Sequence, residues 1–212
     1  MIEIILVRHG ETDWNVERRI QGNRDIPLNV EGRRQAAALG RALASEPLDA
    51  VIASDLRRAM ETARAIAAPH GIAVRAEREL RERRFGAFEG LTHDEIRARY
   101  PHHHAVWRAR VADAEYPPER QTAETLRQFS ARAVNAVVRL MESGFRKLLI
   151  VTHGGVLDCL YRNACGMDLS APRNFDIPNA GINRLSWDGS RLQVMTWAET
   201  AHLNVASLDE IR

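Results

Sequence analysis

Two short apolar runs, each followed by a histidine and a glycine, constrain the fold of this chain more than any other feature. Residues 2–7 lead into Arg8-His9-Gly10, and residues 147–152 lead into His153-Gly154. Such short and nearly continuous runs are typical of strands covered on both faces, as in a parallel sheet. Because the carboxyl ends of parallel strands border the ligand crevice of an open α/β sheet, we expect both histidines to lie in one cleft.

The rest of the chain alternates between helical and strand-like patterns. We expect further strands over 48–53 and 72–75, and helices over 30–45 after an Asn29 cap, 55–68 after a Ser54 cap, 122–141, and from 155 onward. Residues 182–187 and 191–197 flank Asp188-Gly189, which predicts an antiparallel hairpin. Together these patterns predict an α/β fold: a three-layer αβα sandwich with a mainly parallel sheet, one antiparallel strand and a small helical cap insertion. We expect a single domain over 1–212, with the cap insertion at about 77–120, where the periodicity weakens.

The composition restricts the class of protein. Hydrophobic residues make up 45% and charged residues 27% of the 212 residues, so a substantial core can form without metal or disulfide staples. A formal charge of only +2 argues against a dedicated nucleic-acid binder. No segment matches the pattern of a signal peptide or of a membrane span, so we expect no membrane association. We expect Cys159 and Cys165 to be buried free thiols and the protein to be cytoplasmic.

The residues at the strand ends permit phosphate chemistry. A neutral imidazole such as that of His9 is a competent nucleophile, provided that its other ring nitrogen has a fixed acceptor, for which a backbone carbonyl would serve. Arg8 and Arg58 could bind phosphate oxygens through their planar guanidinium groups. His153 and the backbone N–H groups of a helix opening at Gly154-Gly155 could add donors. By themselves these residues indicate a phosphate or nucleotide site of unspecified type.

Further motifs continue this pattern along nearly the whole chain. They are, in order, Leu6-Val7-Arg8-His9-Gly10-Glu11-Thr12, Trp14-Asn15, Arg19-Ile20-Gln21-Gly22, Asp25-Ile26-Pro27-Leu28, Gly32, Gln35-Ala36, Ser54-Asp55-Leu56-Arg57-Arg58-Ala59-Met60-Glu61-Thr62, the segment 80–90, and Val151-Thr152-His153-Gly154-Gly155. In this order they resemble the signature of the histidine phosphatase superfamily, also called the phosphoglycerate mutase-like family. An isolated Arg-His-Gly is a weak signal, but the ordered set is highly specific.

The resemblance implies a role for each matching residue. His9 would be the nucleophile that is transiently phosphorylated, and Glu82 would protonate the leaving oxygen and then activate the hydrolytic water. Arg8, Arg58 and His153 would hold the phosphoryl oxygens. Substrate contacts would come from these residues: Thr12, Asn15, Gln21, Gly22, Phe85 and Gly154. The scheme needs no metal and no cofactor.

Some residues compete with these assignments. On composition alone Glu79 and Glu89 are alternatives for the acid, and only the motif position favours Glu82. Adjacent helical residues point about 100° apart, so we expect Arg57 to lie at the surface while Arg58 faces the cleft. The run His102-His103-His104 has no matched acidic or cysteine ligands, and we expect it to lie on the solvated surface of the cap.

The resemblance implies a metal-independent phosphomonoesterase acting on a small phosphorylated metabolite. Mutases of this family usually carry a tyrosine near the acid and a basic insertion, whereas this chain has Phe85 in a Phe-Gly-x-Phe-Glu-Gly pattern. A cofactor-dependent phosphoglycerate mutase is the alternative, and a non-catalytic phosphate- or phosphoprotein-binding module is a third candidate. The sequence leaves open the substrate, beyond a small-molecule phosphate ester, and the oligomeric state, with a homodimer among the candidates.

Overall fold

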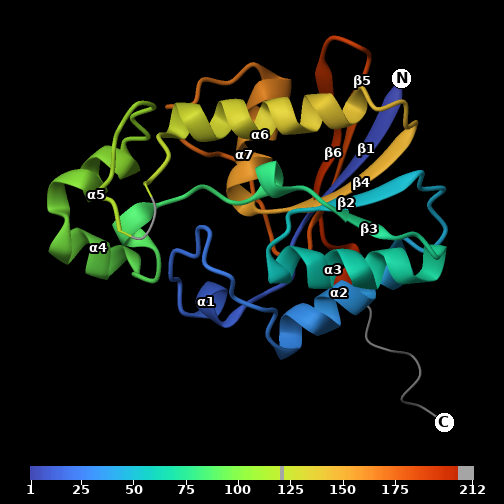
Figure 1. Ribbon diagram of the computed structural model, residues 1–212, viewed down its shortest axis with the longest axis horizontal. Helices are drawn as coiled ribbons and strands as arrows, with labels where there is room; N and C mark the ends of the chain where they lie inside the picture. Colours follow the sequence, from blue (N-terminus) through green and yellow to red (C-terminus); the bar gives the residue numbers. More distant parts are fainter. Residues whose placement is uncertain (120–121, 205–212) are drawn as a thin grey trace.

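A six-stranded sheet is the middle layer of the computed structural model, which describes residues 1–119 and 122–204 (Figure 1). In order across the sheet, its strands are β3 (Val74–Ala76), β2 (Ala50–Ala53), β4 (Lys147–Thr152), β1 (Ile2–Arg8), β5 (Ile182–Trp187) and β6 (Leu192–Glu199). The first four strands are parallel to one another, and β5 is antiparallel to both of its neighbours. The prediction of a mainly parallel sheet with one antiparallel strand is therefore confirmed.

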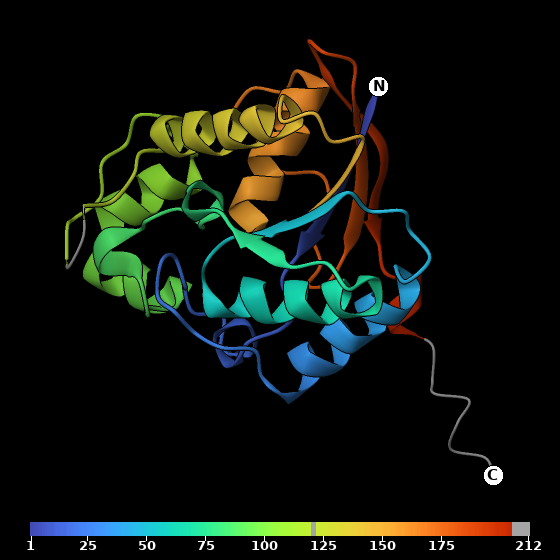
Figure 2. The same ribbon diagram turned by 45° about the vertical axis from the view of Figure 1, so that its right-hand side comes forward.

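Helices cover both faces of this sheet (Figure 2). On one face, Ile5 and Val7 of β1 pack in a cluster with α2 (Val30–Ala42) and α3 (Arg57–Ala67). On the other face, Ile4 and Leu6 pack with α6 (Leu126–Met141) and α7 (Gly154–Cys165). All four β1 side chains are fully buried, and burial of a side chain of this size contributes about 1.5–3 kcal/mol. The continuous apolar run is thus explained by a strand buried on two faces, and the predicted three-layer sandwich is confirmed.

The segment between β3 and α6 adds no strand in its described residues. It contains two short 3₁₀ turns, Arg78–Leu80 and Gly86–Phe88, and two short helices, α4 (His93–Arg99) and α5 (Pro101–Arg108). Phe88, Ile96 and Tyr116 form a small separate apolar cluster there, against which Trp107 packs. Figure 1 shows α4 and α5 at the left, beyond the ends of the strands. The short helix α1 (Asp13–Val16) lies lower in this view, between that pair and α2. This segment covers most of the insertion expected at about 77–120, whose last residue lies outside the described part.

Several expected boundaries are wrong by a few residues. Asn29 caps α2 as expected, accepting a hydrogen bond from the Gly32 N–H at 2.7 Å. Ser54 does not cap α3, which begins after Leu56. The other boundary corrections are that β2 begins at Ala50, β3 covers Val74–Ala76, α2 ends at Ala42, and α6 begins at Leu126 after a Thr125 capping box.

One expectation on the cysteines is also corrected. Both thiols are free, but only Cys159 is buried, whereas Cys165 is exposed at the end of α7. None of the helices in the described ranges combines the length and the apolar composition that a membrane crossing requires.

Candidate active site

The two predicted histidines meet at the carboxyl ends of adjacent parallel strands. His9 follows β1 and His153 follows β4, and the register pairs Arg8 with Thr152. The His9 N–H donates to the Thr152 carbonyl at 3.0 Å, and the two imidazole rings lie edge to face with centroids 5.2 Å apart. Residues separated by more than half of the chain are therefore neighbours because the sheet aligns the strand ends.

The backbone sets the tautomer of His9. Its Nδ1 lies 2.7 Å from the Gly10 carbonyl oxygen, which can only accept, so Nδ1 carries the hydrogen and Nε2 carries the lone pair. The ring is buried, and desolvation, followed by the charges of Arg58 and Arg8, lowers the pKa of His9 well below its ordinary value. His9 is therefore a neutral imidazole with a free basic nitrogen at neutral pH.

Two guanidinium groups lie beside this imidazole: the side chain of Arg58 is fully buried and that of Arg8 is partly buried. Arg8 donates through Nη1 to the Ile177 carbonyl at 2.6 Å, and Arg58 donates to the carbonyls of Arg24 and Gly22 at 2.7 and 2.9 Å. Burial lowers the pKa of Arg8 and that of Arg58 to about 10, so both remain charged at neutral pH. The carbonyls fix the two side chains but do not neutralise them.

Three buried nitrogens in this cluster have no hydrogen-bond partner among the described residues. They are Nε of Arg8, Nε of Arg58 and Nδ1 of His153. The other nitrogen of the His153 ring lies 2.8 Å from the Ser54 hydroxyl, and desolvation, followed by the charges of Arg58 and His9, lowers the pKa of His153 well below its ordinary value. When the Ser54 hydroxyl donates to Nε2 of His153, Nδ1 carries the hydrogen and all three nitrogens are donors. Because buried donors are normally satisfied, three such groups in one place indicate an anion site.

Glu82 lines the same cavity, which has a volume of about 270 Å³. Its carboxylate accepts hydrogen bonds from the backbone N–H groups of Arg83 at 2.8 Å and of Gly155 at 2.9 Å. The Gly155 N–H, expected to face the phosphate, thus holds Glu82 instead. A Cβ at Gly155 would lie only 2.1 Å from Glu82 Oε1, so the close approach requires glycine at this position.

The alternative acids lie elsewhere. Glu79 is half exposed and pairs with Arg139, and Glu89 accepts hydrogen bonds from the backbone of Asn23 and Phe85. Neither lines the cavity. Glu82 is therefore the glutamate that the described structure places beside His9.

The expected substrate contacts divide into two groups. Asn15, Gln21, Gly22, Phe85 and Gly154 line the cavity. Thr12 does not: it is fully buried, and its hydroxyl caps α1 by accepting from the Asn15 N–H at 3.2 Å. Its contribution is to position Asn15.

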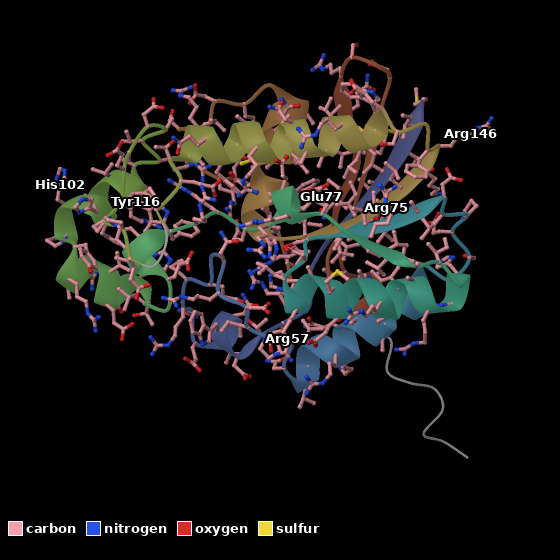
Figure 3. The ribbon with its side chains drawn as sticks, viewed as in Figure 1. Arg57, Arg75, Glu77, His102, Tyr116 and Arg146 are labelled. Carbon is pink, nitrogen blue, oxygen red and sulfur yellow. The ribbon has the colours of Figure 1, made fainter. Side chains whose placement is uncertain are left out.

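Of the residues expected at the surface, Arg57 and His102 are exposed, whereas His103 and His104 are partly buried against Tyr100 and Trp107. Arg57 is exposed, and its Nε lies 3.8 Å from a carboxylate oxygen of Glu61. Figure 3 shows Arg57 on the lower side of the molecule. Figure 3 also shows His102 at the outer end of α5, where it is exposed. Among the described residues, no group of three or more histidine, cysteine or acidic side chains is arranged to hold a metal ion.

Sequence reasoning missed a second set of charged residues in the cavity lining. These are Arg19, Arg83, Arg110, Asp158 and Arg173. Asp158, on α7, accepts hydrogen bonds from Arg110 at 2.7 Å, Arg162 at 2.9 Å and Arg173 at 2.9 Å. Only the i, i+4 spacing of Asp158 and Arg162 was visible as a pattern, because the other partners come from irregular segments.

The family model described as histidine phosphatase superfamily (branch 1) matches residues 4–200. Phosphoglycerate mutase-like protein 4 of Arabidopsis thaliana is 37% identical over 206 residues, which are 95% of this chain and 86% of that protein. The solved structure of Bacillus stearothermophilus YhfR is 33% identical, with a TM-score of 0.87 over 96% of this chain and 100% of the other.

The name of a second similar solved structure states an activity. The mycobacterial glucosyl-3-phosphoglycerate phosphatase Rv2419c in complex with VO3 is 31% identical, with a TM-score of 0.81 over 94% of this chain and 100% of the other. Phosphatases and mutase-like proteins are thus both similar to this chain across most of its length. The strand-end histidines, the two arginines beside them and the whole-length match together show that the chain belongs to the histidine phosphatase superfamily.

Proposed function

We propose that this protein is a phosphomonoesterase that hydrolyses a small phosphate ester through a phosphohistidine at His9. The observation that carries the proposal is the set of unpartnered donors on Arg8, Arg58 and His153 around a neutral imidazole. A phosphoryl group would satisfy all three donors at once, and phosphoryl transfer depends mainly on such positioning and charge stabilisation.

In the first step, the Nε2 lone pair of His9 attacks phosphorus, and the bond between phosphorus and the ester oxygen breaks. Glu82 in its protonated form gives its proton to the departing oxygen, so that an alcohol leaves rather than an alkoxide. Arg8 and Arg58 balance the negative charge on the phosphoryl oxygens. The Gly10 carbonyl stabilises the positive charge that develops on the imidazole, because it accepts the Nδ1 hydrogen.

In the second step, water replaces the alcohol. Glu82, now a carboxylate, takes a proton from the water as its oxygen attacks phosphorus, and the bond from phosphorus to Nε2 breaks. Orthophosphate then leaves, and both His9 and Glu82 return to their starting states. Two guanidinium groups supply the positive charge that other phosphatases take from metal ions, so we propose that the reaction needs no metal.

We infer that α4 and α5 act as a cap over the leaving group. Phe85 and Trp107 line the cavity, and their rings contact each other edge to face with centroids 5.8 Å apart. The free thiols support activity in a reducing compartment, for which we propose the cytoplasm.

The proposal is tested by trapping the intermediate. Incubation with a ³²P-labelled aryl phosphate and rapid denaturation should yield an acid-labile phosphoenzyme, and His9→Ala should not form it. Turnover should persist after exhaustive treatment with a strong chelator. An acid-stable label, or activity that returns only with added divalent metal, would contradict the mechanism.

The mutase alternative is favoured by the name of the Arabidopsis relative, which is mutase-like. Against it stands Phe85, which places an apolar ring where mutases usually carry a tyrosine hydroxyl. Conversion of 3-phosphoglycerate to its 2-isomer, stimulated by the bisphosphate, distinguishes the two activities. If isomerisation outran phosphate release, the hydrolase assignment would be wrong.

A further inference from the structure

The backbone just before β5 takes over the hydrogen bonding of β1 at the point where β1 leaves the sheet. On the β5 side, the antiparallel pairing of β1 ends at the pair of Val7 and Ile182. Beyond this pair, the N–H of Ala180 lies 3.1 Å from the Arg8 carbonyl oxygen and 3.3 Å from that of His9. The segment before β5 therefore holds the backbone of the proposed nucleophile.

This segment is a tight turn with an uncommon backbone conformation. The Gly181 N–H donates to the Pro178 carbonyl at 3.1 Å, which closes a turn over residues 178–181. Within it, Ala180 is fully buried and has a φ of 55°, in the left-handed region that favours glycine. A strained residue persists only where the surrounding contacts fix it, and such residues cluster at functional sites. The strain is therefore a reason to expect a functional contact from this turn.

Asn179, in the same turn, links two parts of the site. Its Nδ2 donates to the His9 carbonyl at 3.0 Å and to Oδ1 of Asn15 at 3.3 Å, with a longer contact of 3.4 Å to the Gly10 carbonyl. Because a carbonyl oxygen can only accept, the amide of Asn179 must present its nitrogen to these groups. Asn15 lines the catalytic cavity and Asn179 does not, so an effect of Asn179 on a substrate must pass through another residue.

The orientation of the Asn15 amide depends on this contact. Asn15 Oδ1 also accepts from the Thr12 N–H at 3.1 Å and lies 3.0 Å from the Thr12 hydroxyl. The hydroxyl can donate or accept, so it is compatible with either orientation of the amide. The Thr12 N–H and the Asn179 amide nitrogen can only donate, and both require the Asn15 oxygen on their side. Nδ2 of Asn15 is thereby turned to the opposite side, and it donates to none of the residues that the structure describes.

We propose that Asn179 is a positioning residue, which fixes the Asn15 amide so that Nδ2 donates to a phosphoryl oxygen of the substrate. The inference rests on the proposed function, in which Arg8, Arg58 and His153 hold the same phosphoryl group. Without Asn179, only the Thr12 N–H still requires the correct orientation of the amide. The amide then populates both orientations, and the phosphoryl group loses part of a charge-assisted hydrogen bond.

A double-mutant cycle tests this inference through the inhibition constant of inorganic phosphate against an aryl phosphate substrate. Asn15→Ala should raise this constant about tenfold, because a hydrogen bond to a charged group is lost, and Asn179→Ala should raise it about fivefold. In the Asn15→Ala background, Asn179→Ala should change the constant by less than about twofold, whereas an independent structural effect would appear in full in both backgrounds. Asn179→Ser also lacks the amide and should give the same coupling, so it replaces Asn179→Ala if that variant does not fold.

Asn183→Ala is the matched control. Asn183 is another asparagine whose Nδ2 donates to a β1 carbonyl, that of Leu6 at 3.1 Å, but it does not line the cavity. This substitution should lower the urea midpoint and leave the inhibition constant unchanged. The control thus separates a general loosening of β1 from the positioning of Asn15.

The outcomes distinguish this inference from the proposed function. If Asn179→Ala has the same effect in both backgrounds, or no effect, the positioning role is overturned and the hydrolase is left intact. If no aryl phosphate is hydrolysed, the proposed function fails, and calorimetric titration of the wild type and the three variants with inorganic phosphate completes the cycle. Coupled affinities in that titration support the positioning role, and independent affinities or an absence of phosphate binding overturn it.

Discussion

The substitution Gly155→Ala tests Glu82, the proposed acid–base residue, independently of the residues that we propose to bind phosphate. A Cβ at this position would lie 2.1 Å from Glu82 Oε1 and 3.0 Å from Phe129 Cε1, whereas ordinary contacts begin at 3.4 Å. The Glu82 carboxylate must therefore move by about 1.3 Å, because the helix backbone of α7 is the less mobile partner. Arg8, Arg58 and His153 keep their contacts.

The displacement should lower turnover with little loss of stability. A misplacement of about 1 Å reduces catalysis by about 100-fold, which corresponds to about 2.7 kcal/mol in the activation free energy. Alanine in place of glycine within a helix favours folding by about 1 kcal/mol, which offsets part of the steric strain. We therefore expect a folded protein that binds inorganic phosphate normally but releases poor leaving groups slowly.

The assay compares two leaving groups. Phenolate needs a proton in order to depart, so kcat for phenyl phosphate should fall about 100-fold. Dinitrophenolate departs without one, so the burst of 2,4-dinitrophenol that accompanies phosphoenzyme formation should be nearly unchanged. Gly40→Ala is the control, since its Cβ would lie 2.5 Å from the Ala65 carbonyl, far from the cavity, and should lower stability without changing kcat. Wild-type turnover of phenyl phosphate by Gly155→Ala would refute the role given to Glu82.

Three further expectations follow from the buried polar contacts. Burial lowers the pKa of His9 and of His153, so below about pH 6.5 the unfolded chain binds more protons than the folded one, and the free energy of unfolding should fall by up to about 2.7 kcal/mol per pH unit. Urea titrations at about pH 7.5 and about pH 5.5 measure this decrease, and equal midpoints at the two values would contradict it. Ser54→Ala removes the hydrogen bond to His153 and should weaken competitive inhibition by inorganic phosphate about tenfold; an unchanged inhibition constant would exclude this positioning role. Glu124→Gln disrupts the two-pronged ion pair with Arg132 and should destabilise the protein by about 3 kcal/mol, and a urea midpoint equal to that of the wild type would count against it.

Local sequence patterns predict those features of the site that depend only on where the strands end. Strand-end placement was enough to bring His9 and His153 together, because a parallel sheet aligns the carboxyl ends of its strands. Ser54 was mistaken for a helix cap, since a serine before a helix looks the same whether its hydroxyl bonds the backbone or a distant ring. The partners of Asp158 could not be predicted, because Arg110 and Arg173 come from segments without periodicity.

Burial of one cluster accounts for both the proposed nucleophile and the proposed anion site. The desolvation that keeps His9 neutral also lowers the pKa of Arg8 and Arg58, at roughly 3 kcal/mol for each guanidinium. If the cluster were open to water, desolvation would no longer disfavour the charged guanidinium groups. However, the imidazole would be protonated more readily and the phosphoryl charge would be held more weakly. A neutral imidazole beside two charged guanidinium groups is therefore one arrangement, and it is the reason that we propose a phosphate dianion as its ligand.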